Sequence, residues 1–145
     1  MITEPLIPGE ALLKIVGDFY QDYVVFLIDD TAGTLPADPT LVDVAPLEID
    51  ELYSYARQSV PLDPFTVTLV GTVEAKCADR AWTFSGGSVS FTHIAYAVGA
   101  TLTNKDVTGT LERLVPANDG NTLTIPNQGT YLADGFTISQ QGGLG

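Results

Sequence analysis

Few residues in this chain carry the side chains that most enzyme chemistry requires. His93 is the only histidine and Cys77 the only cysteine. A general base at His93 would need a nucleophile and an orienting carboxylate within hydrogen-bond reach, and no sequence motif places them there. We interpret His93 as a hydrogen-bonded structural histidine and Cys77 as a small buried hydrophobe. A hydrolase in which His93 works with an aspartate is the weakest hypothesis.

Metal and cofactor sites have little support from the sequence. Asp29-Asp30 and the turn at 118–121 offer oxygen ligands for calcium, but neither has the spacing of a D-x-D-x-D-G loop. Asp, Asn and Gly are common at turns without any metal. One histidine and one cysteine make zinc implausible, and no glycine-rich phosphate loop occurs. We therefore expect no metal, no cofactor and no enzymatic activity.

The aromatic residues offer a different chemistry, because tyrosine and tryptophan rings can stack on sugars. The stretch Tyr53–Val60 reads YSYARQSV. As the end of a helix it would continue an apolar stripe from Ile49. As a strand it would put Tyr53, Tyr55 and Arg57 on one face, where Arg57 can stack on a ring or pair with an acidic residue. Periodicity leaves both readings open, and the ordinary role of such residues is packing.

The surrounding pattern predicts mostly strands. Residues 65–78 alternate between apolar and polar positions, which is typical of a strand with one buried face. Further short strands are expected at 11–16, 23–28, 81–84, 89–100, 109–115, 123–126 and 131–139, separated by Gly, Asn and Pro turns. The strand at 89–100 is apolar on both faces, so it is either central in a sandwich or covered by a partner chain.

These elements predict an all-β fold, an antiparallel β-sandwich of jelly-roll type with one short helix near residues 46–53. Residues 1–140 are expected to form a single domain and residues 141–145 a flexible, Gly-rich tail.

The charge balance excludes several partners. Eighteen acidic residues stand against six basic ones, a formal net charge of −12. Nucleic acids and anionic membranes need clustered Lys and Arg, so we expect neither as a partner. The N-terminal stretch does not read as a secretory signal, and no run of about 18 apolar residues could span a membrane. We therefore expect synthesis in a cytosol.

Several motifs in order resemble a family of small bacteriophage virion structural proteins of the tail-fibre type. They are YARQ at 55–58, SVSFTHIAYAVGA at 88–100, GTLERLVP at 109–116 and LTIPNQGTYLADGFTIS at 123–139. The order and spacing agree over residues 47–140. This chain departs from the family pattern before YARQ, where glycines are usual, and in the longer TLTNKDVTG segment at 101–109.

The resemblance implies a non-enzymatic virion protein, made in the host cytoplasm, that assembles as an oligomer, a homotrimer, with other virion proteins on the particle exterior. The expected role is a tail fibre, baseplate or adaptor component. The alternatives are a capsid decoration protein and a carbohydrate-binding module that recognises a host glycan. The candidate structural and interface residues are Tyr53, Tyr55, Arg57, Phe91, His93 and Tyr96.

Overall fold

The computed structural model describes residues 22–60, 66–67 and 72–141. The chain forms two compact units. One unit comprises Asp22–Val60 and Arg80–Ala133. The described part of the other comprises residues 66–67, 72–79 and 134–141. The predicted strand at 11–16 and most of the predicted tail lie outside the described residues.

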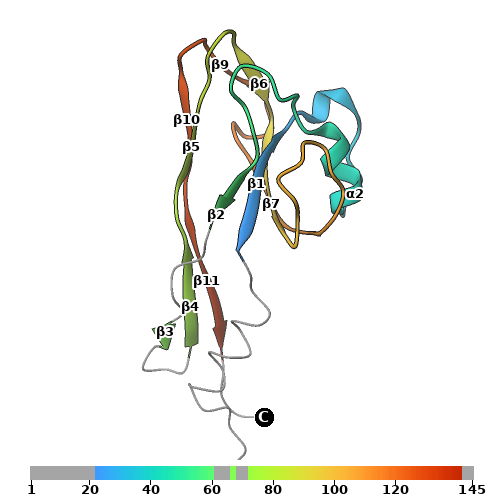
Figure 1. Cartoon of the computed structure of the whole chain (residues 1–145). Helices are drawn as coiled ribbons and strands as arrows, with labels where there is room; N and C mark the ends of the chain where they lie inside the picture. Colours follow the sequence, from blue (N-terminus) through green and yellow to red (C-terminus); the bar gives the residue numbers. More distant parts are fainter. Residues whose placement is uncertain (1–21, 61–65, 68–71, 142–145) are drawn as a thin grey trace, which may run out of the picture. The chain divides into compact units, whose positions relative to one another are not determined.

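The larger unit is organised around a four-stranded antiparallel sheet with the order β2-β1-β7-β8. Its strands are β1 (Tyr23–Ile28), β2 (Gln58–Val60), β7 (His93–Val98) and β8 (Thr110–Pro116). All six residues of β1 are buried, because helix α2 and the loop after β7 lie on one side of this strand and the ribbon of β5 and β10 on the other (Figure 1). A strand covered on both faces reads as a continuous apolar run, as YVVFLI does.

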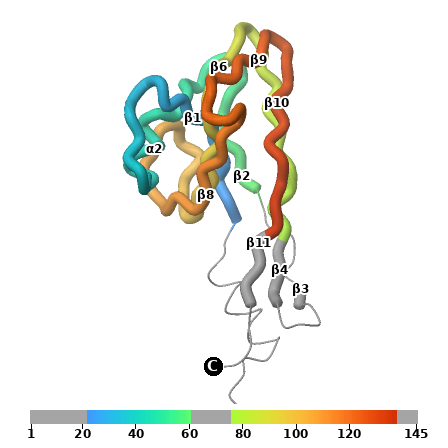
Figure 2. Tube along the Cα trace, turned by 180° about the vertical axis from the view of Figure 1, so that it is seen from behind, coloured from blue at the N-terminus to red at the C-terminus, as the bar shows by residue number. Residues whose placement is uncertain are grey.

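Two-stranded ribbons complete this unit. Strand β5 (Arg80–Thr83) pairs with β10 (Thr130–Ala133), and β6 (Val89–Phe91) pairs with β9 (Leu123–Ile125). At the upper end of the unit in both views, β5 leads into β6 and β9 leads into β10, so that the β6–β9 ribbon follows the β5–β10 ribbon (Figures 1 and 2). The core that these elements enclose includes fully buried Phe26, Phe84 and Phe91.

The predicted helix near 46–53 is wrong in position. Helix α2 spans Leu41–Val44, and the 3-10 helices η1 and η2 span Asp30–Ala32 and Ala45–Leu47. Helix α2 begins early because the Asp43 carboxylate accepts hydrogen bonds from both the backbone N–H and the hydroxyl of Thr40. The helical segment ends at Leu47, since Ile49 instead donates its N–H to the Leu27 carbonyl of β1.

The predicted continuous strand at 89–100 is also wrong, because it is broken at Thr92 into β6 and β7, which belong to different sheets. The alternation of buried and exposed residues in β6 shows one covered face, whereas the middle of β7 is buried on both. The middle residues of β7 are buried by the chain itself, since the burial is that of the single chain. Its burial therefore gives no argument for a covering partner, which was one of the two readings.

The smaller unit contains a three-stranded antiparallel sheet with the order β11-β4-β3. Its strands are β3 (Thr66–Val67), β4 (Thr72–Cys77) and β11 (Phe136–Gln141). Thr66 lies opposite Glu74, so the stretch predicted as a single strand at 65–78 is an antiparallel pair. Alternation continues through both arms of such a pair, and it cannot reveal the reversal between them.

The all-β class with one short helix is confirmed. The sandwich or jelly-roll arrangement stays a prediction. Within the part of the chain that the structure describes, no helix is long and apolar enough to cross a membrane.

Candidate functional site

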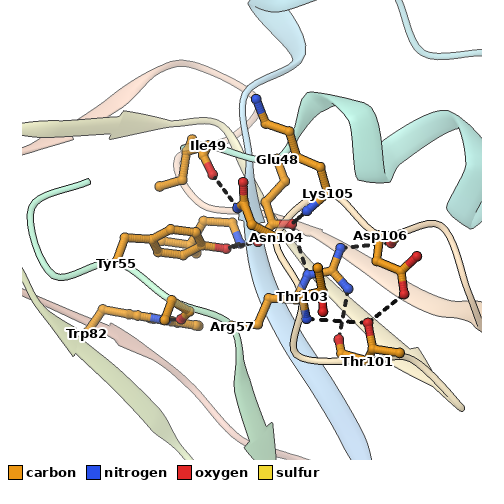
Figure 3. Close-up of polar contacts among 12 residues, drawn as sticks. Glu48, Ile49, Tyr55, Arg57, Trp82, Thr101, Thr103, Asn104, Lys105 and Asp106 are labelled. Atoms are coloured by element: carbon orange, nitrogen blue, oxygen red, sulfur yellow. Dashed lines mark hydrogen bonds and ion pairs between the residues drawn. The ribbon is translucent and has the colours of Figure 1, made fainter. Parts of the chain in front are cut away.

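The most developed polar site of the larger unit is centred on the Glu48 carboxylate. Glu48, Tyr55 and Arg57, which we call the Glu48 network, are all buried within the unit (Figure 3). Glu48 Oε2 accepts a hydrogen bond from the Tyr55 hydroxyl at 2.6 Å. Its Oε1 accepts one from Arg57 Nε at 2.9 Å and another from the Lys105 backbone N–H at 2.7 Å. Both carboxylate oxygens are therefore engaged, as a buried charge requires.

The Arg57 guanidinium joins three parts of the chain. Its Nη1 donates to the Thr101 carbonyl at 3.0 Å and its Nη2 to the Asp106 carbonyl at 2.9 Å. Its central carbon also lies 4.3 Å from the centre of the Phe26 ring, within the range of a cation–π contact. The planar fork of donors that arginine provides suits this arrangement, and lysine could not reproduce it.

The Tyr55 hydroxyl connects the Glu48 network to the central strand. It accepts a hydrogen bond from the Leu27 backbone N–H of β1 at 3.0 Å while it donates to Glu48. Burial, and then the neighbouring Glu48 carboxylate, raise the pKa of Tyr55 far above its usual value of 10.0. The phenol therefore stays protonated and cannot serve as a general base near neutral pH.

The sequence positions these groups through simple local structure. Glu48 lies directly after η2 and forms an isolated bridge with Ile28 of β1. Tyr55 and Arg57 are two positions apart on the extended segment that enters β2, so both point inward while Ala56 is exposed. Trp82 of β5 donates its indole N–H to the Ala56 carbonyl at 2.8 Å, which holds this segment in place.

Residues 101–106 form a loop that the Glu48 network fastens to the sheet. Besides the two carbonyl groups that Arg57 binds, the Asn104 side chain donates to the Ile49 carbonyl at 3.0 Å. The hydroxyl of Thr101 donates to Asp106 Oδ2 at 2.5 Å, and this hydrogen bond holds the pKa of Asp106 below its usual range. Leu102 within this loop is 54% exposed, and Val107, the residue directly after it, is 44% exposed.

In YSYARQSV the strand begins only at Gln58, but Tyr55 and Arg57 are both buried on either side of exposed Ala56, as the strand reading predicted, whereas that reading is wrong for Tyr53. Tyr53 and Ser54 have φ values of 56° and 68°, so they form a left-handed turn and not a strand. Tyr53 is 42% exposed and does not share the face of the other two side chains. Arg57 pairs with an acidic residue and also lies over a ring, but that ring belongs to Phe26.

His93 belongs to a separate, smaller cluster at the start of β7. Its Nδ1 lies 2.9 Å from the Thr92 hydroxyl and 3.9 Å from Asp30 Oδ2. The Thr92 hydroxyl accepts a hydrogen bond from the Asp30 backbone N–H at 3.0 Å, and Thr92 is fully buried. A buried hydroxyl bound in this way cannot act as a nucleophile on a substrate. The contacts of His93 join η1 to the sheet.

The remaining candidates are core residues. Phe91 is fully buried, with its ring centre 4.8 Å from that of Tyr131 in an edge-to-face contact. Tyr96 is also buried and makes the same kind of contact with Tyr23 at 6.0 Å. Both pairs contribute packing energy and present no reactive group.

The turns considered for calcium contain hydrogen bonds within the protein. Asp29 Oδ1 accepts hydrogen bonds from both the backbone N–H and the hydroxyl of Thr31, which caps η1. The Asn121 N–H donates to the Asn118 carbonyl within a tight turn. Among the described residues, no group of three or more His, Cys, Asp or Glu side chains could hold a metal ion.

The sequence analysis missed Glu48 and the loop that it binds. Glu48 lies in an acidic stretch with Asp50 and Glu51, and nothing in the spacing distinguishes the one carboxylate that is buried. Its only sequence signal is the position directly after Pro46-Leu47, between two apolar segments. The partner loop is 44 to 57 residues away along the chain, a separation that local patterns do not encode.

The Glu48 network has the properties of a structural clamp. Both oxygens of Glu48, the hydroxyl of Tyr55 and all three nitrogens of Arg57 form hydrogen bonds with one another or with backbone groups, so the network is held mainly by contacts within the protein. Comparison of the chain with protein-family models, with curated proteins and with solved structures finds no match.

Proposed function

We propose that this chain is a non-enzymatic structural subunit of a bacteriophage particle, which assembles as an oligomer on the particle exterior as a tail fibre, baseplate or adaptor component. The proposal combines the motif resemblance with one observation, the fastening of the loop 101–106 by Arg57. The YARQ motif that carries the resemblance supplies Tyr55 and Arg57 to a buried clamp. A motif whose side chains hold the fold together is expected in a structural protein more than in an enzyme.

The fixed loop gives the proposal a physical basis. Subunit association buries apolar side chains, and it costs less conformational entropy when the segment that carries them is already ordered. Leu102 is exposed on such a segment, and exposed Val107 follows directly after it. Arg57 and Glu48 bind the backbone of this loop and hold it in place before any partner arrives. We therefore propose that the loop contacts a neighbouring subunit.

The oligomer can be tested by multi-angle light scattering on the purified chain. We expect a mass three times that of the 15.4 kDa chain. A double variant, Leu102→Ser with Val107→Ser, should shift the mass towards the monomer. The matched control is Leu132→Ser, because Leu132 is equally exposed at 53% but lies on β10. A wild-type chain that stays monomeric up to ~1 mM would contradict self-association.

The location can be tested independently. Antibodies raised against the chain should label purified phage particles produced from the DNA that encodes it, and electron microscopy should place the label on the tail. Labelling that follows the symmetry of the capsid would favour the decoration role. Particles that contain no copy of the chain would rule out both roles.

A further inference from the structure

A hollow on the surface of the larger unit lies beside the left-handed turn at Tyr53. It has a volume of about 150 Å³ and is lined by Ile49, Asp50, Leu52, Tyr53, Ser88, Val89 and Ser90. None of the three residues of the Glu48 network lines it. The hollow is therefore a separate feature from the Glu48 network.

Tyr53 is held in a defined position at the edge of this hollow. Its backbone has a φ of 56°, which bulky residues rarely adopt, and Ser54 follows with 68°. The turn is held because the Tyr53 carbonyl accepts a hydrogen bond from the Ser85 N–H at 2.9 Å, and the Leu52 carbonyl accepts one from the Tyr55 N–H at 3.0 Å. Unusual backbone of this kind is frequent at ligand sites.

The ring of Tyr53 packs against a glycine turn. A methyl group added at Gly87 would lie 2.6 Å from two atoms of the Tyr53 ring, so only glycine leaves room for the ring in this position. The Tyr53 residue is nevertheless 42% exposed. The contact with Gly87 thus positions the ring, while Tyr53 as a residue stays exposed and lines the hollow.

The chemistry around the hollow combines one aromatic ring with hydrogen-bonding groups. The Asp50 side chain is 66% exposed, with Oδ1 2.6 Å from Lys105 Nζ. Ser88 and Ser90 contribute hydroxyl groups, of which Ser90 Oγ also lies 2.8 Å from Thr124 Oγ1. A sugar ring matches such a set, because its C–H face stacks on an aromatic ring while its hydroxyl groups bond to carboxylates and hydroxyls.

We propose that the hollow binds one ring of a neutral saccharide, with Tyr53 as the stacking platform. The net charge of −12 disfavours an anionic ligand. The volume is below the roughly 300 Å³ at which pockets for drug-sized ligands begin, so a single terminal ring fits better than a longer ligand. Binding at one site is weak, and several copies in an oligomer would raise it by avidity. The site itself does not depend on the assembly proposed above.

The first test uses the full chain on an array of immobilised neutral glycans built from glucose, galactose, mannose and N-acetylglucosamine. At least one of the immobilised glycans should retain the protein. Titration of the same sugar in solution, followed by ¹⁵N NMR, should shift the backbone amide signals of Tyr53 and of residues 88–90. An array on which no glycan retains the protein, together with no shift at ~10 mM sugar, would overturn the proposal, as would shifts confined to another part of the chain.

The second test separates the ring from the fold. Tyr53→Ala should weaken binding by about ten-fold, the effect expected for loss of a stacking partner. Gly87→Ala should weaken it similarly, because the new methyl group displaces the ring while Tyr53 is still present. Leu132→Ala, at a comparably exposed position on β10, should bind as the wild type does. Unchanged binding in both the Tyr53 and the Gly87 variants would overturn the proposal.

Discussion

The Glu48 carboxylate and the Arg57 guanidinium meet at 2.9 Å with both side chains completely buried. Each also binds the loop that follows β7, Glu48 through the Lys105 N–H and Arg57 through the carbonyl groups of Thr101 and Asp106. One ion pair therefore connects the segment after η2, the entry to β2 and a surface loop. This connection is the basis of the following predictions.

Arg57→Ala should lower the free energy of unfolding by about 3–5 kcal/mol, because it leaves the buried Glu48 charge without its partner. Urea denaturation followed by tryptophan fluorescence measures the change. Lys105→Ala is the control. It removes the Lys105–Asp50 ion pair, whose side chains are 43% and 66% exposed, and should cost less than about 1 kcal/mol. Equal losses in the two variants would show that burial of the Arg57 pair has no special importance.

Tyr55→Phe should lower the free energy of unfolding by about 1.5–3 kcal/mol. The substitution leaves Glu48 Oε2 and the Leu27 N–H without the hydroxyl that bonds to both. Tyr53→Phe removes the same group from an exposed ring and should change stability by less than about 0.5 kcal/mol. If Tyr55→Phe is as stable as the wild type, the hydroxyl does not connect β1 to Glu48 as we describe.

The raised pKa of Tyr55 also predicts a loss of stability at alkaline pH. Its folded pKa is raised above the usual 10.0, so its contribution is complete below about pH 10, where the phenol is protonated in both states. At higher pH the unfolded chain releases this proton and the folded chain keeps it. Stability should fall by about 1.4 kcal/mol per pH unit from this group alone.

The comparison of the wild type with Tyr55→Phe isolates this effect from the other titrating groups. Between pH 9 and ~11.5, the free energies of unfolding of the two proteins, measured by denaturation, should converge as the pH rises. A difference in free energy of unfolding that stays constant over this range would mean that the phenol ionises as easily in the folded chain as in the unfolded chain.

Thr92→Val should lower the free energy of unfolding by about 1–2 kcal/mol, because the Asp30 N–H loses its acceptor at a site where valine fills the same volume. Thr124→Val on β9 is the matched control. Its hydroxyl bonds to Ser90 at an exposed position, so the cost should be below about 0.5 kcal/mol. Thermal unfolding followed by circular dichroism compares the two, and a Thr92 variant no less stable than the control would refute this role.

The strands were predictable from sequence because their signals are local. The apolar run YVVFLI and the alternation of TVEAKC identify β1 and β4 without any knowledge of their partners. The predicted strand boundaries were wrong where the chain bends within a run of residues whose sequence pattern continues on both sides of the bend. The chain bends at Thr92 between β6 and β7, and the Thr92 hydroxyl accepts a hydrogen bond from the remote Asp30 N–H, although threonine is common in strands.

The candidate site was only half predictable, because its other half is remote in sequence. The alternation around Ala56 correctly put Tyr55 and Arg57 on one face, but the acidic partner could have been any of several carboxylates near it. Glu48 is selected by η2, which ends at Leu47 and directs the next side chain inward. The left-handed turn at Tyr53 depends on tertiary contacts with residues 85–87, which periodicity cannot show.

The central claim is that the Glu48 network fixes a surface loop, and hydrogen exchange of one amide tests it most directly. Lys105 is an exposed residue, yet its N–H donates to buried Glu48 Oε1 at 2.7 Å. The Thr103 N–H of the same loop has only the exposed Thr101 hydroxyl at 3.3 Å. We predict that the Lys105 amide exchanges at least about a thousand-fold more slowly than that of an unfolded peptide, while the Thr103 amide exchanges rapidly. Equal, rapid exchange at both amides would contradict the account.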